Sequence, residues 1–256
     1  MISVSSTKFC EQSIEETLKN VSKEFDHWEI FSEGEHYLPL VLSRFGAVAP
    51  SYNMKYSIHA PICDVNIAAL SERMREASVM EMMSIMEQAI SMEVKLITIH
   101  PGVHSMAVFG QEQKSVARAK KSLRTLDRVT SEYGIRIAVE NMPAFPFFLA
   151  RTAEELKDLL DGTDMKVCFD IGHAHTTGQI DPMIELLGDR IANIHIHDNH
   201  GQKDEHLTIG EGDIDFQNVL GKIGKYKGNY VIESKSLTSA VESKKKLQVM
   251  LGGTPL

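Results

Sequence analysis

Short runs of apolar and β-branched residues alternate along this chain with longer segments whose apolar positions recur at helical spacing. Such alternation is typical of βα units around a parallel sheet. Several of the runs are nearly continuous in Ile and Val, as expected for strands that are covered on both faces. The pattern predicts eight helices and eight strands, with the strands at Ile2–Ser5, His27–Phe31, Lys55–His59, Lys95–His100, Arg136–Glu140, Lys166–Asp170, Ile191–His195 and Tyr230–Glu233.

Two of the predicted helices begin with a recognisable cap. The tetrapeptides Ser-Ile-Glu-Glu at Ser13 and Thr-Ala-Glu-Glu at Thr152 both resemble a capping box. The stretch from Leu70 to Met92 carries many Met residues, and a Met stripe at helical spacing indicates packing. We therefore assign it no functional role.

Eight strands, eight helices and 256 residues are the parameters of a TIM barrel. A doubly wound open sheet is the competing fold, but it needs a Gly-rich first turn. The first turn of this chain, Ser5 to Phe9, has neither a G-x-G motif nor a P-loop. We therefore predict a single (β/α)8 TIM barrel domain of the α/β class over residues 1–256.

The composition is that of an ordinary globular protein, with 43% hydrophobic and 24% charged residues. The formal charge of −8 would repel a polyanion at long range, although bound cations can reverse the sign locally. Cys10, Cys63 and Cys168 form no C-x-x-C pair, so we expect reduced packing residues rather than a disulfide or thiolate site. The N-terminus has no signal-peptide pattern and no apolar run could span a membrane, which favours a cytoplasmic protein.

Metal-ligand residue types end the predicted strands three to eight. In a TIM barrel the active site lies at the carboxyl ends of the strands, so these side chains should point into one shared space. Asp and Glu (35) and His (11) are a minority of the 256 residues, and an unbroken series of six is hard to attribute to chance. The series is His59, His100, Glu140, Asp170, His195 and Glu233.

Three more candidate ligands follow closely. His173 comes three residues after Asp170, and Asp204 and His206 form a D-x-H motif in the long loop after the seventh strand. Nine ligands exceed the number that one ion uses, which indicates two or three metal ions. Imidazole and carboxylate ligands without thiolate favour zinc or manganese, with Glu140 as the natural bridge between ions. Such a centre is suited to metal-assisted hydrolysis of a phosphoester.

The chain resembles the xylose isomerase-like barrels, which include endonuclease IV and many sugar isomerases and epimerases. The resemblance spans essentially the whole chain. It is carried by IHAP at His59, IHPG at His100, VEN at Glu140, FDIGHAHTTG at Asp170, HIHD at His195, DEHLTIGEGDIDF at Asp204 and VIES at Glu233. Together these motifs are highly specific for the superfamily, whereas any one of them alone is weak.

Endonuclease IV cleaves DNA beside abasic sites with three zinc ions, and all nine of its ligand positions find matching residue types in this chain. The resemblance implies three ligand sets, in which Glu140 is shared by the first two. The sets are His59, His100 and Glu140; Glu140, Asp170, His195 and Glu233; and His173, Asp204 and His206. Sugar isomerases and epimerases typically use only the second set, around one ion, and two of its carboxylates act as acid and base.

The loops at the rim depart from endonuclease IV. The loop after the second strand, Ser32 to Tyr37, is acidic and lacks arginine, and the loop after His59 lacks an aromatic wedge. Binding of damaged duplex DNA would need a bulky wedge and basic neighbours for the phosphates. Ile62 could still be a small wedge, but Asp64 adds a further acidic group. These rim loops favour a smaller substrate.

The sequence therefore predicts a phosphodiester hydrolase of the endonuclease IV type, acting on damaged DNA at abasic sites or on a small phosphorylated or sugar substrate. Glu140 and Glu233 are the predicted catalytic residues, and the predicted cofactor is two or three zinc ions, with manganese as an alternative. A single-metal sugar or sugar-phosphate isomerase or epimerase is the alternative function, in which the same two glutamates exchange protons with carbon. A metal-dependent binding module without catalysis is the third interpretation.

Overall fold

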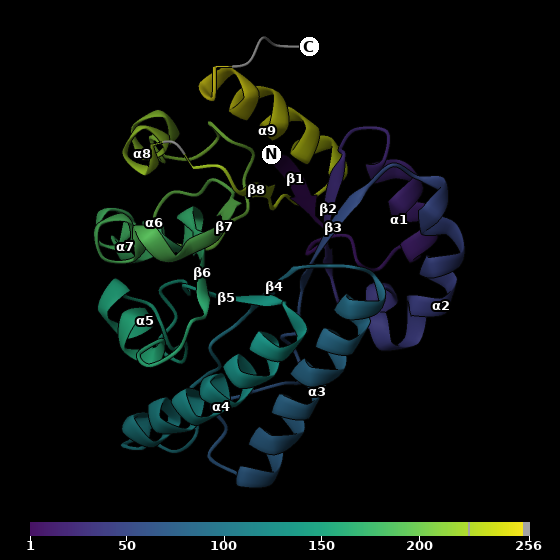
Figure 1. Ribbon diagram of the computed structural model, residues 1–256. Helices are drawn as coiled ribbons and strands as arrows, with labels where there is room; N and C mark the ends of the chain where they lie inside the picture. The colour runs from purple at the N-terminus through teal and green to yellow at the C-terminus, as the bar shows by residue number, and fades with distance from the viewer. Residues whose placement is uncertain (225, 253–256) are drawn as a thin grey trace.

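The computed structural model describes residues 1–224 and 226–252, and within these residues eight parallel strands close into a barrel (Figure 1). Every strand pairs with the next one, and β1 pairs with β8. The strands are β1 (Ile2–Ser5), β2 (His27–Phe31), β3 (Lys55–His59), β4 (Leu96–Ile99), β5 (Arg136–Glu140), β6 (Lys166–Asp170), β7 (Ile191–Ile196) and β8 (Asn229–Ile232). The prediction of a TIM barrel is confirmed. The predicted domain ends at residue 256, beyond the described residues, and its limits stay a prediction.

The strand boundaries follow the prediction closely, except at two of the candidate ligands. The ladder of β4 ends at Ile99 and that of β8 at Ile232, so His100 and Glu233 are the first residues beyond their strands. Glu233 still donates its backbone N–H to the carbonyl of Ile196, at 3.0 Å. The chain therefore stays in register with its neighbour while it delivers the side chain to the rim.

The helices surround the strands as a ring (Figure 1). In the described part of the chain, β6 and β7 are joined by two helices where the pattern predicts one, because Gly178 adopts a left-handed conformation (φ 66°) and ends the first of them. The helices are α1 (Ile14–Val21), α2 (Leu38–Val48), α3 (Glu72–Ser91), α4 (Glu112–Tyr133), α5 (Ala153–Leu159), α6 (Ile171–Thr177), α7 (Ile180–Leu187), α8 (Phe216–Ile223) and α9 (Leu237–Met250).

The two predicted helix caps are present in part. Ser13 Oγ accepts the N–H of Glu16 at 3.3 Å, and Thr152 Oγ1 accepts the N–H of Glu155 at 3.1 Å. The Glu155 carboxylate does not return to Thr152 but accepts the N–H of Arg151, at 2.8 Å. Each cap therefore satisfies one of the free N–H groups at a helix start, which stabilises it by about 1 kcal/mol.

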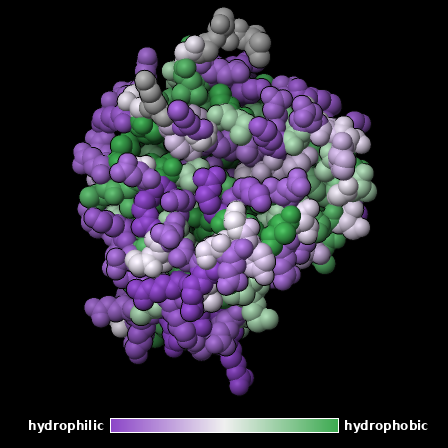
Figure 2. Space-filling view, viewed as in Figure 1, coloured by the Kyte–Doolittle hydropathy of each residue, from purple (hydrophilic) through white to green (hydrophobic). Residues whose placement is uncertain are grey.

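The hydrophobic core of the described residues forms one cluster. Large apolar side chains such as Trp28 and Phe169 are buried in the hydrophobic core, while the predicted Met stretch in α3 packs through Met82 and Met86 and leaves Met80 exposed. Figure 2 shows that hydrophilic residues cover much of one face of the molecule, with hydrophobic groups between them. No helix in the described ranges is both long and apolar enough to cross a membrane.

Candidate metal centre

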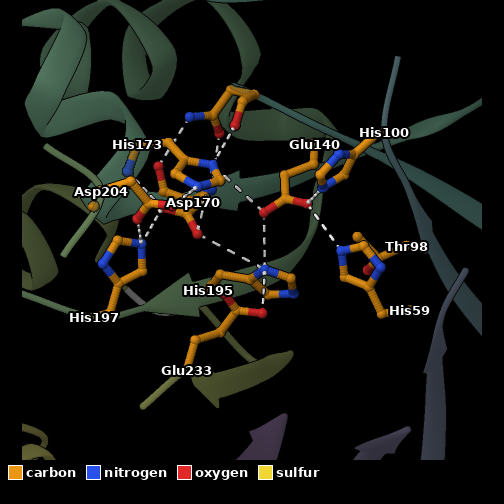
Figure 3. A network of polar contacts seen from close by, with 12 residues as sticks. His59, Thr98, His100, Glu140, Asp170, His173, His195, His197, Asp204 and Glu233 are labelled. Carbon is orange, nitrogen blue, oxygen red and sulfur yellow. Dashed lines mark hydrogen bonds and ion pairs between the residues drawn. The ribbon is translucent and has the colours of Figure 1, made fainter. Parts of the chain in front are cut away.

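The predicted ligands converge on one space at the carboxyl ends of the strands (Figure 3). Glu140 lies at its middle, and each of its carboxylate oxygens faces different histidines. Oε2 is 3.2 Å from His59 Nε2 and 3.1 Å from His100 Nε2. Oε1 is 3.0 Å from His195 Nδ1 and 3.6 Å from His173 Nδ1. The carboxylate therefore has the geometry of a bridge between two ligand sets.

A second set of acceptors surrounds Nδ1 of His195. Besides Glu140, this nitrogen is 3.5 Å from Glu233 Oε1 and 3.8 Å from Asp170 Oδ2. All four residues are buried, with at most 3% of their surface exposed. Three carboxylate oxygens from three other strand ends thus lie within 3.8 Å of this nitrogen.

In the third predicted set, Asp204 lies near both histidines. Asp204 Oδ2 is 3.1 Å from His206 Nε2 and 3.5 Å from His173 Nε2. His206 Nδ1 is 3.6 Å from Glu233 Oε2, which joins this set to the second one. The long loop after β7 therefore brings both of its candidate ligands to the barrel rim.

One carboxylate, that of Asp198, holds this loop in place. It accepts N–H bonds from Asn199 (2.9 Å), Gly210 (2.7 Å), Gly212 (3.0 Å) and Ile214 (3.2 Å). A Cβ on Gly212 would lie 2.4 Å from Asp198 Oδ1, so this close approach requires glycine. The turn at Gly210 to Asp213 therefore shapes the loop that carries Asp204 and His206.

His206 itself has a strained backbone, with φ at 49°. A non-glycine residue in the left-handed region costs about 1–3 kcal/mol and persists only where the surroundings fix it. The strain aims the imidazole at Asp204 and Glu233. This is the pattern expected of a residue that is held for function.

Several of the histidines have their second ring nitrogen fixed by a partner outside the centre. Nδ1–H of His59 donates to the carbonyl of Ala60 at 2.9 Å, and Nδ1–H of His173 donates to the carbonyl of Asn141 at 2.9 Å. In each case Nε2 is left facing the centre. Metal-ligating histidines are oriented in this way in proteins, because the second hydrogen bond selects the tautomer.

Glu29 is a functional candidate that the sequence reasoning missed. It lies in the middle of β2, is fully buried, and its Oε1 is 2.8 Å from His195 Nε2. Its other oxygen accepts hydrogen bonds from Asn193 Nδ2 (2.8 Å) and Ser57 Oγ (3.2 Å). A buried carboxylate behind an imidazole fixes which nitrogen faces the metal. The one available signal was a charged residue inside an otherwise apolar strand.

The other rim histidines have different positions. His197 lies inside the centre, with Nε2 3.2 Å from Asp170 Oδ1. His200 is exposed and pairs with Glu205 at 2.9 Å. His104 and His175 are not among the groups of residues that could together hold an ion in the described chain.

The electrostatics of the centre depend on its imidazoles. Burial alone would raise the pKa of Glu140, but His195, His100 and His59 outweigh burial and hold the pKa well below its usual range. Burial would lower the pKa of His173, but Asp170, Asp204 and Glu140 raise it well above its usual value. Metal binding must displace the protons that this network holds.

The residues present fit divalent metal. Buried polar atoms without a hydrogen-bond partner are costly, and some of those in the described residues lie here on groups that face one another. They include Asp170 Oδ2, Glu233 Oε1, Asp204 Oδ1, His206 Nδ1 and both ring nitrogens of His197. Five groups of three candidate ligands have their ligand atoms within 4.8 Å of one another. The structure thus contains candidate metal-binding groups, and the roles of the nine residues as ligands stay a prediction.

Cys168 is the one cysteine in these groups, together with Glu140 and His195. Its thiol is buried, and burial raises its pKa well above the usual value, so it is uncharged at neutral pH. All three cysteines are free. The expectation of packing residues holds for Cys168, which is buried, whereas Cys10 is partly exposed and Cys63 is exposed.

The rim loops are tied together by an acidic residue. Glu33 Oε1 accepts the N–H groups of Ile62 at 2.7 Å and Cys63 at 2.8 Å. This carboxylate thus links the loops after β2 and β3. In endonuclease IV, to which the chain has a resemblance, these two loops carry the residues that grip DNA. Beside it a cavity of about 540 Å³, lined by Ile62, His100 and Phe148 among others, has the size of a small-molecule pocket.

Comparison with known proteins places the chain in a family. The model of the xylose isomerase-like TIM barrel family matches residues 21–250. The uncharacterized protein MJ1311 of Methanocaldococcus jannaschii is 34% identical over 258 residues, which cover 97% of this chain and 88% of that protein. A probable endonuclease 4 of Acholeplasma laidlawii is 31% identical over 147 residues, or 50% of this chain and 49% of that protein.

Among solved structures, a D-tagatose 3-epimerase-like protein is similar over 98% of this chain and 97% of its own, with a TM-score of 0.92 and 33% identity. D-psicose 3-epimerase shares the fold over 98% of this chain and 99% of its own, with a TM-score of 0.81 and 14% identity. A zinc-containing IOLI protein shares it over 98% of each chain, with a TM-score of 0.80 and 19% identity. The structural neighbours are mainly sugar epimerases and isomerases. The comparisons therefore favour the alternative prediction over the endonuclease.

Proposed function

The chain belongs to the xylose isomerase-like TIM barrel family, and we propose that it is a metal-dependent enzyme that isomerises or epimerises a small sugar or sugar phosphate. The observation that carries this proposal is the set of groups around Nδ1 of His195. Glu140, Asp170 and Glu233 present carboxylate oxygens to that nitrogen at 3.0, 3.8 and 3.5 Å. This is the ligand set that the resemblance assigns to sugar isomerases.

The bound ion, for which we propose zinc or manganese, would supply Lewis-acid polarisation of the substrate carbonyl. The protein's own residues then move the proton at the adjacent carbon. Glu233 is the better placed base, since its Oε1 has no hydrogen-bond partner. Glu140 is surrounded by imidazoles that stabilise its charged form, which suits a ligand better than a base.

The rim supports a small substrate. The pair of loops that Glu33 ties together presents negative charge, which would repel a phosphate backbone. The cavity next to His100 is large enough for a sugar or sugar phosphate and is lined partly by Phe147 and Phe148. Aromatic and apolar walls with a few polar groups are typical of small-molecule sites.

The test is solvent exchange into the substrate. Purified protein is incubated with zinc or manganese and a panel of ketoses, aldoses and their phosphates in D2O, and deuterium next to the carbonyl is followed by NMR. We expect incorporation and a new sugar, both lost in Glu233→Gln and kept in the matched rim variant Glu205→Gln. Absence of exchange with every sugar and both metals would refute the proposal.

Phosphodiester hydrolysis is a second candidate, because a one-ion isomerase has no use for His59 and His100. Both present Nε2 to the same oxygen of Glu140, at 3.2 and 3.1 Å, as a second ion bridged by this carboxylate requires. Metal-dependent nicking of a duplex with one abasic site, compared with undamaged duplex, tests it. Nicking that disappears in His59→Ala, without any sugar exchange, would favour the hydrolase.

A further inference from the structure

We propose that the barrel has a second binding site, for a small organic phosphate, at the amino ends of its strands. A cavity of about 450 Å³ lies there, and we call it the lower mouth. The first residues of β2, β3, β5 and β8 are part of its wall. None of the nine candidate metal ligands, all of which the structure describes, lines this cavity. The proposal therefore does not depend on the proposed function.

The lower mouth lies at the opposite end of the barrel from the candidate metal centre. His27, Lys55 and Arg136 are the first residues of β2, β3 and β5. Asn229 is the first residue of β8, and all four line the cavity. Glu140, at the middle of the metal centre, is the last residue of β5. A strand thus separates the two sites.

Two of the cationic side chains are on the inner side of the barrel. Side chains alternate between the two faces of a strand, so residues four positions apart point to the same side. Lys55 comes four residues before His59, and Arg136 comes four residues before Glu140. His59 and Glu140 face each other inside the barrel at 3.2 Å. Lys55 and Arg136 therefore share that inner side, in agreement with their place in the wall of the lower mouth.

The charge of the lower mouth favours an anion. Among the described residues that line it, four side chains are cationic and one is acidic: Lys55, Lys95, Arg136, Lys227 and Glu93. The ion pairs found within residues 1–224 and 226–252 involve none of these four cations. The whole chain has a net charge of −8, so this excess of positive charge is local. Like charges without counter-charge repel one another, and a bound anion would relieve that repulsion.

The rest of the lining indicates the class of anion. Lys and Arg bind phosphate oxygens through charge-assisted hydrogen bonds, and Arg can donate two of them in parallel. Apolar side chains of Met54, Met92 and Leu96 also line the cavity, and they can pack against an organic group. The volume falls within the range of about 300–1,000 Å³ that is typical of small-molecule sites. A phosphate ester of a small molecule matches both parts of this wall.

The inner end of the lower mouth is fixed by buried hydrogen bonds. His27 is 7% exposed, and its Nε2 is 3.2 Å from Ser57 Oγ, which also lines the cavity. Ser57 Oγ in turn donates to Glu29 Oε2 at 3.2 Å. Because this uses the single hydroxyl hydrogen, His27 Nε2–H is the donor to Ser57. The wall is therefore ordered before a ligand arrives, which reduces the entropy cost of binding.

The positive charge of the lower mouth belongs to its Lys and Arg side chains. Burial, which Glu29 only partly opposes, lowers the pKa of His27 from 6.5 to about 4. The imidazole is then neutral at pH 7 and contributes no charge. The cationic side chains are thus the groups to replace in a test.

Titration of the full chain with inorganic phosphate and with phenyl phosphate, at constant ionic strength, tests the proposal. Lys55→Gln/Arg136→Gln removes two cations of the lower mouth, and both side chains are exposed, so the variant should fold. Arg73→Gln/Lys114→Gln is the matched control, because these exposed residues are near the starts of α3 and α4, at the other end of the barrel. Calorimetry is done with zinc present and after chelation.

We expect wild type and the control variant to bind phenyl phosphate with a Kd of about 1 mM or lower, with zinc or without it. Inorganic phosphate should bind more weakly, because it lacks the organic group. The lower-mouth variant should bind both anions at least tenfold more weakly. Equal affinity in all three proteins, or binding that requires zinc, would place the anion elsewhere and overturn the proposal. Equal affinity for the two anions would overturn the organic part of the ligand.

A second measurement locates the ligand without a variant. In protein with 13C-labelled histidine, saturating phenyl phosphate should shift the ring signals of His27 and leave those of His200, at the opposite rim, unchanged. Shifts at His200 with none at His27 would overturn the proposal. Because neither measurement uses a sugar substrate, failure of the proposed isomerase activity would leave these results unaffected.

Discussion

Replacing Glu29 by Gln should weaken zinc binding without a change in side-chain volume. The carboxylate contacts His195 Nε2 at 2.8 Å and leaves Nδ1 to face Asp170 and Glu233. Loss of such a supporting carboxylate typically costs about 10- to 100-fold in metal affinity, or about 1.4–2.7 kcal/mol. Metal affinity is therefore expected to fall, although residue 29 itself binds no ion.

The stability of the metal-free protein should fall as well. An amide at position 29 keeps one oxygen, so its N–H groups must face either His195 Nε2 or the Asn193 and Ser57 donors that now bind the carboxylate. A buried donor left without an acceptor costs about 1–3 kcal/mol. For a chain of this size, that corresponds to a fall in Tm of roughly 2–12 °C.

Competition with a chromophoric chelator measures the zinc affinity, and thermal unfolding with and without zinc measures the stability. Glu81→Gln is the control, because Glu81 accepts a hydrogen bond from the Tyr37 hydroxyl at 2.7 Å away from the centre. A folded Glu29→Gln protein with zinc affinity within twofold of wild type would refute the reasoning. It would show that His195 needs no support from β2.

Three further predictions follow from other contacts. Gly172→Ala should lower stability by about 1–3 kcal/mol through overpacking against His197. Thermal unfolding should show a smaller loss when Gly172→Ala is combined with His197→Ala, and purely additive effects of the two substitutions would contradict the contact. Burial lowers the pKa of His36 from 6.5 to about 4, so the neutral imidazole contributes up to about 3 kcal/mol to the free energy of unfolding above pH 6.5, and this contribution is lost as the pH falls to 4. In urea unfolding, the free energy of unfolding of His36→Gln should depend less on pH in that window than that of wild type, and an equal pH dependence would contradict the prediction. Glu33→Ala should speed hydrogen exchange at the amide of Ile62 by about tenfold or more. Unaltered exchange would contradict a stabilising hydrogen bond from this amide to Glu33.

The fold could be predicted because its signal is local and repeated. Runs of β-branched residues gave most strand boundaries, and the closed barrel then brought the strand-end residues His59, Glu140 and Asp170 together. The ends of β4 and β8 were less certain, because the last ladder bond depends on the neighbouring strand. Gly178, which ends α6, divides a segment that the apolar period alone predicts as one helix.

The support for the centre could not be predicted from periodicity. Glu29 reaches His195 across the barrel interior, and no sequence spacing reports that contact. His197 is two residues after His195 at the end of β7, so its position in the centre depends on how α6 and the following loop pack on it. Asp198 likewise follows a strand, but its carboxylate binds backbone N–H groups rather than facing the centre. Residue type indicated metal chemistry at these positions, while their separate roles depend on tertiary contacts.

The loop that Asp198 closes would determine how an incoming ion meets the proposed ligands. Four main-chain N–H groups bind that carboxylate, so the path of the chain past Asp204 and His206 is set during folding. The conformational entropy of ordering the loop is lost at that stage and does not reduce the affinity for the ion. Exchange of one divalent ion for another would then be limited by ligand departure and proton release, without local refolding. Metal selection in this protein would follow the supply of ions and ligand chemistry.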